Sequence, residues 1–224
     1  MKVQDKDRIL VTGCAGFIGM HLCYSLLKDG FLVYGIDNMN TYYEKSLKFD
    51  RLKNIDSFPN FEYSIVDLRS LKEVQKIFKN FGPQKVVNLA AQAGVQYSIE
   101  NPYTYIHSNV EGFLNILECS KKFNSKGLIY ASSSSVYGSN EKVPFSEDDI
   151  TDYPISVYAA TKKSNELMAN VYNDLYSLNV TGLRFFTVYG PWGRPDMALF
   201  LFTKAILDGE PIQVFNDGKM IRDF

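Results

Sequence analysis

The feature that most constrains the fold is a set of glycines placed directly after a short apolar segment. Residues Arg8–Thr12 are rich in apolar and β-branched side chains, and Gly13, Gly16 and Gly19 follow them at once. Glycine is needed where a chain turns tightly, approaches a pyrophosphate with its backbone, or packs a helix closely. Over residues 17–27 apolar side chains recur every three or four positions, which predicts a helix. The sequence therefore predicts a strand, a phosphate-binding turn and a helix.

Short strand-like runs alternate with amphipathic helical segments over most of the chain. This alternation predicts a parallel sheet with helices on both faces. We therefore expect a Rossmann-like, doubly wound α/β domain over residues 1–185. The further strand-like runs are Leu32–Asp37, Phe61–Ile65, Lys85–Leu89, Lys126–Ala131 and Val180–Phe185.

The regular rhythm stops after Phe185. Glycines and prolines crowd residues 190–195, and a helix near Ala198–Leu207 and a strand near Ile212–Phe215 are predicted to follow. We expect residues 186–224 to begin a smaller C-terminal substrate domain. Because no further helix or strand is present to bury its apolar side, we expect this domain to be truncated.

The composition limits the partners that the chain can have. Its 224 residues include 46% hydrophobic and 22% charged residues, which is typical of a globular protein with a sizeable core. The net charge of -1, spread along the chain, indicates neither nucleic-acid nor membrane binding. The three cysteines lack disulfide or metal spacing, His21 and His107 stand alone, and no apolar run suits a signal peptide or a membrane span. We expect a cytoplasmic protein without a bound metal.

An acidic residue closes the second predicted strand. After a glycine turn, strand and helix, an acid at the place of Asp37 accepts hydrogen bonds from the adenosine ribose hydroxyls. Its carboxylate would repel a 2′-phosphate, so the sequence predicts NAD rather than NADP. The alternative is that Asp37 only caps the strand end.

Tyr158 and Lys162 lie four positions apart in a predicted helix over residues 156–176, so they share one face. A tyrosine with an ordinary pKa of about 10 is a poor base, but an adjacent ammonium favours its phenolate. Ser133 follows the predicted strand Lys126–Ala131, at the sheet edge where ligands bind. We predict that these three side chains do the chemistry. Without the upstream glycine turn, the tyrosine and the lysine would be interpreted as solvated surface residues.

Several strings resemble the extended short-chain dehydrogenase/reductase family over nearly the whole chain. They are Thr12–Gly19, Asn88–Gln92, Ser132–Gly138 and Tyr158–Lys162, while residues 91–98 and 182–197 are similar to the UDP-glucuronate 4-epimerase branch of that family. The resemblance implies NAD-dependent epimerisation of UDP-glucuronate to UDP-galacturonate through a 4-keto intermediate, in polysaccharide biosynthesis. It also implies a homodimer formed by the helices over residues 103–123 and 156–176.

The resemblance assigns roles to individual residues. It implies an NAD-binding domain over residues 1–185, a partial sugar-nucleotide-binding region over 186–224, and a catalytic triad of Ser133, Tyr158 and Lys162. The implied cofactor-binding residues, besides Tyr158 and Lys162, are Gly13, Gly16, Phe17, Ile18, Gly19, Asp37, Asn38, Asp67, Leu68, Leu89, Ala90 and Ala91. The implied substrate-binding residues are Ser133, Ser134, Ser135, Tyr158, Thr187, Arg194 and Arg222, the last on the UDP pyrophosphate.

The sugar carboxylate separates the competing interpretations. A 4-keto uronic acid loses carbon dioxide when its carboxylate aligns with the carbonyl π system, and a clamp from Arg194 and Thr187 can prevent that alignment. Relatives that decarboxylate or dehydrate carry an acidic residue where this chain has Ser134 and Ser135, which favours plain epimerisation. Two alternatives remain open: a 4-epimerase of neutral sugars such as UDP-glucose, and an inactive NAD-binding fragment.

Overall fold

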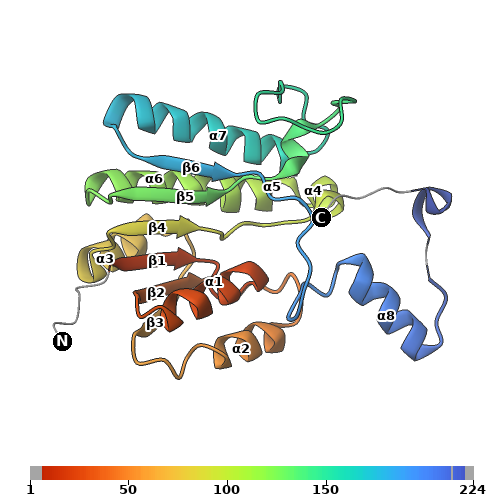
Figure 1. Ribbon diagram of the computed structural model, residues 1–224, viewed down its shortest axis with the longest axis horizontal. Helices are drawn as coiled ribbons and strands as arrows, with labels where there is room; N and C mark the ends of the chain where they lie inside the picture. The colour runs from red at the N-terminus through yellow and green to blue at the C-terminus, as the bar shows by residue number, and fades with distance from the viewer. Residues whose placement is uncertain (1–6, 213, 220–224) are drawn as a thin grey trace.

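A single parallel sheet organises the protein, of which a computed structural model describes residues 7–212 and 214–219. Within these residues the sheet has six strands in the order β3-β2-β1-β4-β5-β6 (Figure 1). The order reverses between β1 and β4, which confirms the predicted doubly wound α/β fold. The strands are β1 (Arg8–Thr12), β2 (Leu32–Asp37), β3 (Phe61–Ile65), β4 (Lys85–Asn88), β5 (Gly127–Ala131) and β6 (Val180–Leu183).

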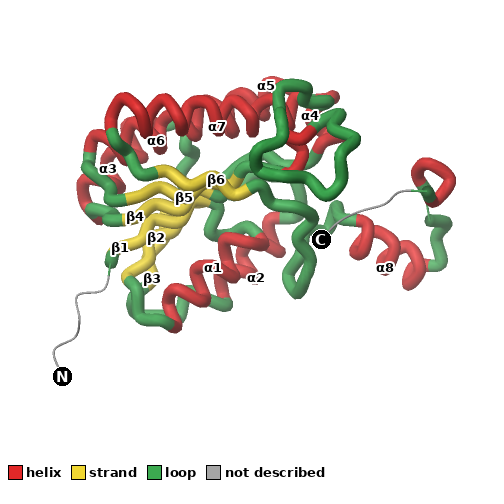
Figure 2. Tube along the Cα trace, turned by 45° about the horizontal axis from the view of Figure 1, so that its top comes forward, coloured by secondary structure: helices red, strands yellow, loops and turns green. Residues whose placement is uncertain are grey.

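Helices cover both faces of the sheet (Figure 2). One face carries α1 and α2, and the other carries α3, α6 and α7. The bounds are α1 (Phe17–Lys28), α2 (Lys45–Lys53), α3 (Leu71–Phe81), α4 (Val95–Glu100), α5 (Pro102–Tyr105), α6 (Gly112–Lys122), α7 (Val157–Tyr176) and α8 (Ala198–Asp208), with short turns η1 (Ile106–Glu111), η2 (Ser134–Tyr137) and η3 (Phe215–Gly218).

Two cores sandwich the central strand β1. Successive strand side chains point to opposite faces, so Leu10 packs with Phe78 and Phe113, whereas Val11 packs with Met20 on the other face. All five of these side chains are buried. The sheet is therefore held rigidly from both sides, and its carboxyl edge is a stable platform for a binding site.

The helix that was predicted over residues 103–123 is built from three successive segments. It begins as α5, passes through the π-helical turn η1, and continues as α6. A π turn inserts an extra residue and redirects the side chains that follow. Here it places Asn109, which is buried, toward the loop after β4.

The prediction of a strand near Ile212–Phe215 is wrong. The described residues there contain no strand, and the short 3-10 turn η3 begins at Phe215. Asp217 and Gly218 have φ angles of 53° and 75°, which close a turn instead of extending the chain. The preceding helix α8 has no buried residue and projects from the body in Figure 1. None of the described helices combines the length and apolarity that crossing a bilayer requires.

Candidate active site

A cavity opens at the carboxyl edge of the sheet, where β1, β2, β4 and β5 end. It brings together predicted residues that are far apart in the sequence. Those that line it are Gly13, Gly16, Phe17, Ile18, Gly19, Asp37, Asn38, Asp67, Leu68, Leu89, Ala90, Ala91, Ser133, Tyr158, Lys162, Thr187 and Arg194.

The glycine turn leaves no room for side chains. Gly13 has a φ of 74°, and a Cβ on it would lie 2.9 Å from the Ala90 amide nitrogen. A Cβ on Gly19 would lie 2.0 Å from the Gly13 carbonyl oxygen. Helix α1 then begins at Phe17, and its N-cap Gly16 offers no side-chain cap, so the first amides of the helix are available to an anion. The turn therefore fits the pyrophosphate of a dinucleotide.

Asp37 is buried and already holds part of this turn in place. Its carboxylate accepts hydrogen bonds from the backbone amides of Ala15 at 3.2 Å and Met39 at 2.9 Å. The ammonium of Lys48 lies 3.6 Å away and donates to the Asn40 side chain at 2.9 Å. Burial lowers the pKa of Lys48, while Asp37 opposes that change. Asp37 thus caps backbone amides and also lines the cavity, so both predicted roles are compatible.

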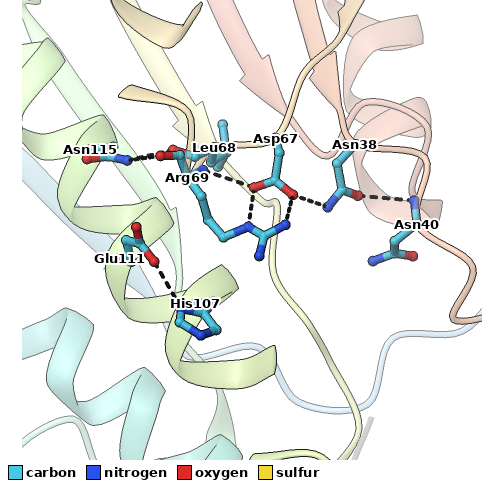
Figure 3. A network of polar contacts seen from close by, with 8 residues as sticks. All are labelled: Asn38, Asn40, Asp67, Leu68, Arg69, His107, Glu111 and Asn115. Carbon is cyan, nitrogen blue, oxygen red and sulfur yellow. Dashed lines mark hydrogen bonds and ion pairs between the residues drawn. The ribbon is translucent and has the colours of Figure 1, made fainter. Parts of the chain in front are cut away.

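Asp67 anchors a polar network beside the cavity (Figure 3). Arg69 donates to both of its carboxylate oxygens, at 2.9 and 3.0 Å, and Asn38 donates at 3.2 Å. Burial opposes ionisation, but these hydrogen bonds hold the pKa of Asp67 below its usual value. The Asn115 amide fixes the neighbouring Leu68 carbonyl at 2.7 Å. Asp67 and Leu68 are therefore held on the cavity wall, and their contact with the cofactor stays a prediction.

Helix α7 delivers Tyr158 and Lys162 to the cavity. Its N-cap is Ser156, whose hydroxyl accepts from the Ala159 amide at 3.0 Å. The Lys162 ammonium is buried, donates to the Ala131 carbonyl at 2.8 Å, and lies 5.9 Å from the Tyr158 ring centre. The predicted shared face is thus confirmed by geometry.

The electrostatics of this pair differ from the sequence expectation. Burial raises the pKa of Tyr158, and the groups that oppose the rise are the Ser133 hydroxyl and the Arg194 guanidinium. Burial lowers the pKa of Lys162 to about 8. The predicted lowering of the Tyr158 pKa by Lys162 is therefore wrong, because desolvation acts on both groups and Lys162 is engaged by a backbone carbonyl.

Ser133 caps the 3-10 turn η2 beside Tyr158. Its hydroxyl accepts from the Ser135 amide at 3.2 Å and donates to the Ser135 hydroxyl at 3.1 Å. The backbone amide of Ser134 donates to the Phe185 carbonyl at 2.9 Å, and Ser134 does not line the cavity. Of the predicted substrate-binding serines Ser133, Ser134 and Ser135, all of them described, Ser133 alone is among the residues that line the cavity, where Ser132 joins it.

Arg194 reaches the cavity already paired with an acid. Its Nε donates to Asp196 Oδ1 at 3.0 Å and its Nη2 bonds the second oxygen, while the Tyr42 hydroxyl donates to that oxygen at 3.0 Å. Burial and Asp196 raise the pKa of Tyr42 to about 12. Thr187 lines the same cavity. Arg222, the other expected substrate residue, lies outside the described residues.

Sequence reasoning missed several residues that support the site. Asn109 ties the loop after β4 to α7, accepting from the Gln92 amide at 2.7 Å and donating to the Thr161 hydroxyl at 3.1 Å. Glu166 accepts from the Ser132 hydroxyl at 2.5 Å and pairs with Arg184. Glu166 lies one helical turn after Lys162, and this spacing was the signal in the sequence that could have placed it on the same helix face.

The two histidines have ordinary partners. His107 contacts Glu111 at 3.1 Å, and His21 donates through Nε2 to the Pro191 carbonyl at 2.9 Å. No group of three potential metal ligands occurs in the described part of the chain.

Comparison with known proteins places this site in a family. The sequence profile of the NAD dependent epimerase/dehydratase family matches residues 9–224. The chain belongs to this family. Among curated relatives, Protein CapI of Staphylococcus aureus is 62% identical over 217 residues, covering 97% of this chain and 65% of that protein. UDP-glucuronate 4-epimerase 4 of Arabidopsis thaliana is 52% identical over 222 residues, covering 96% of this chain and 50% of that protein.

Solved structures of epimerases have the same fold as this family member. UDP-glucuronic acid 4-epimerase from Bacillus cereus, in complex with UDP-glucuronic acid and NAD, superimposes with a TM-score of 0.91 at 36% identity, over 97% of this chain and 68% of that one. UDP-glucose 4-epimerase from Thermotoga maritima, with UDP-glucose, gives 0.86 at 34% identity, over 96% and 68%. The present epimerase/dehydratase chain thus spans about half to two thirds of its relatives. The predicted epimerase resemblance and NAD dependence are confirmed at the level of the family.

Proposed function

We propose that the protein catalyses the NAD-dependent 4-epimerisation of UDP-glucuronate to UDP-galacturonate. The observation that carries the proposal is one cavity lined by the glycine turn, by Tyr158 and Ser133, and by Arg194. The first feature suits a dinucleotide, the second a sugar hydroxyl and the third a carboxylate. The names of the Arabidopsis thaliana and Bacillus cereus relatives support the same substrate.

The cofactor would be held by three parts of the cavity. The first amides of α1 would bind the pyrophosphate, Asp37 the adenosine ribose, and Asp67 with Leu68 the adenine. NAD, when bound, supplies a reversible hydride acceptor. In this proposal residues 1–185 form the NAD-binding domain.

Tyr158 and Ser133 would handle the proton. In this step Tyr158 would act as its phenolate, having released its own proton before the sugar is oxidised. As C4 is oxidised to a ketone, the phenolate oxygen accepts the C4 hydroxyl proton and becomes a phenol, with the Ser133 hydroxyl as a hydrogen-bond partner. The bound 4-keto sugar then rotates so that its opposite face is presented to the cofactor. When C4 is reduced on that face, the same proton returns from Tyr158 to the C4 oxygen. Lys162, anchored on Ala131, places its amine beside the phenol throughout.

Arg194 and Thr187 would hold the sugar carboxylate. An arginine has five N–H groups, and Asp196 takes only two of those on Arg194, so the guanidinium keeps donors that are not bonded to Asp196. A carboxylate fixed by these groups and the Thr187 hydroxyl is kept from aligning with the C4 carbonyl. Residues 186–224, including Arg222, would form the sugar-nucleotide part of the site.

The Asp196 pair is also the observation that favours the neutral-sugar alternative, because it neutralises the charge that a carboxylate would use. Incubation with UDP-glucuronate and, separately, with UDP-glucose distinguishes the two, with products resolved by chromatography. We expect UDP-galacturonate to form and UDP-glucose to react far more slowly. Faster turnover of UDP-glucose would favour the neutral-sugar enzyme, and NAD binding without turnover of either sugar would favour the inactive fragment.

We also propose that the protein is a cytoplasmic homodimer formed through α7 and the helical stretch α5–α6. Leu167, Val171 and Leu175 recur every four residues on α7, and their exposed fractions are 55%, 51% and 68%. An apolar stripe of this kind is typical of a helix that packs against a partner. Sedimentation should give a dimer, and Val171→Lys should shift it toward monomer. A wild-type monomer at all concentrations would contradict the assembly.

A further inference from the structure

Arg51 on α2 is a fully buried cation whose hydrogen bonds go to neutral oxygens. Its relative exposure is 0%. It donates to the carbonyls of Ala15 at 3.3 Å, Trp192 at 3.0 Å and Gly193 at 3.0 Å, and to the Tyr43 hydroxyl at 2.6 Å. A buried charge is costly unless its donors are all satisfied. The carbonyls that satisfy it come from two segments that are far apart in the sequence.

One of these segments is the glycine turn. Ala15 lies inside the turn, and both ends of its polar backbone are fixed: its carbonyl accepts from Arg51, and its amide donates to Asp37. A displacement of Arg51 would therefore move the turn that lines the dinucleotide part of the cavity.

The other segment is the loop that leads to Arg194. Three successive carbonyls of this loop accept hydrogen bonds from the first two helices, Pro191 from His21 on α1 and Trp192 and Gly193 from Arg51. In Figure 1 the loop after β6 descends past α1 and α2 before it enters α8. Trp192 has a φ of 64°, a conformation that a large side chain adopts only when its surroundings enforce it.

We infer that Arg51 is a positioning residue that couples the glycine turn to the loop over residues 190–194, so that binding of the dinucleotide orders the loop. The assignment of NAD to the glycine turn and of the sugar to Arg194 rests on the proposed function. The coupling between the two segments does not depend on the identity of the sugar. The planar guanidinium suits this role because its donors diverge toward both segments. A lysine has one ammonium and cannot span them.

Hydrogen exchange followed by mass spectrometry tests the coupling without any sugar. Exchange of the backbone amides in residues 190–197 is measured with no NAD and with saturating NAD. In the wild type we expect NAD to slow this exchange on the order of tenfold. In Arg51→Lys the slowing should fall below about twofold at saturating NAD. Lys53→Met removes an exposed charge from the same helix and should behave as the wild type.

Two outcomes would overturn the inference: an Arg51→Lys variant that keeps the wild-type slowing, or a wild type in which NAD leaves the exchange of this loop unchanged. Should Arg51→Lys not yield folded protein, Arg51→Gln is held to the same criteria. A parallel titration with UDP-glucuronate, with and without NAD, tests the proposed function separately. If UDP-glucuronate does not bind, the substrate assignment is wrong, but the hydrogen-exchange result on the coupling is unaffected.

Discussion

The dinucleotide half of the cavity and the loop that carries Arg194 are held by different kinds of interaction. The glycine turn is fixed by close packing: Val11, Cys14 and Ala15 have a relative exposure of 0%. The segment beyond β6 has little core of its own, and α8 has no buried residue. Its approach to the cavity depends on a few hydrogen bonds, chiefly those from Arg51 and His21. Substitutions within one half should therefore act mainly on the cofactor or mainly on the sugar, whereas a substitution of Arg51, which bonds both halves, should affect both.

The largest effect is expected from Tyr158→Phe, which removes the proton acceptor and leaves both halves of the cavity intact. Turnover of UDP-glucuronate should fall on the order of a thousandfold or more, while NAD binding is retained. The measurements are the rate of UDP-galacturonate formation and an NAD titration. Tyr153→Phe makes the same change at an exposed site and is the control. Near-normal turnover in Tyr158→Phe would contradict the proposed role of Tyr158 as proton acceptor.

Gly19→Ala tests the dinucleotide half of the cavity, which is held by close packing. The new methyl group would lie 2.0 Å from the Gly13 carbonyl oxygen, so the turn must shift. NAD affinity should fall on the order of a hundredfold, measured by calorimetry. Gly127→Ala, where the nearest atom is 3.8 Å away, should change little. Equal NAD affinities for the two variants would mean that the turn is not the phosphate site.

Arg194→Ala tests the loop. We expect the KM for UDP-glucuronate to rise on the order of tenfold to a hundredfold, because charged hydrogen bonds to the carboxylate are lost. A decarboxylated UDP-pentose should appear among the products, while NAD affinity stays unchanged. Chromatography and an NAD titration are the measurements. An unchanged KM with UDP-galacturonate as the only product would end the clamp proposal.

The smallest effect concerns stability and the buried Lys162. Its pKa falls from 10.5 to about 8 in the folded protein, so below about pH 8 both states are protonated and the fold carries the full cost of the buried charge. As pH rises from about 8 to 10.5, the folded state alone loses its proton and that cost disappears. Lys162→Met should therefore be more stable than the wild type at pH 7, by up to about 3 kcal/mol. Thermal melts should show the difference shrinking toward pH 10, and a constant difference would contradict this interpretation.

The sequence was sufficient for the sheet and for bringing to the cavity the residues that belong to a local pattern. The strand runs, the glycine turn, Asp37 and the Tyr158–Lys162 spacing all follow from periodicity and motif order. Arg51 and Asp196 were not predicted, because an isolated charge carries no signal of its partner. Arg51 and Trp192 are 141 positions apart, and only the fold brings them together. The direction of the Tyr158 pKa shift could not be predicted from the sequence either, because it depends on burial.

The carboxylate of Asp196 has a consequence for how ligands reach the cavity. Since Arg194 already carries its counter-charge, an approaching sugar acid feels little long-range attraction from this loop. Acidic and neutral nucleotide sugars should thus arrive at similar rates with similar dependence on ionic strength. Discrimination between them would be expressed in how long each stays, as differences in dissociation rate.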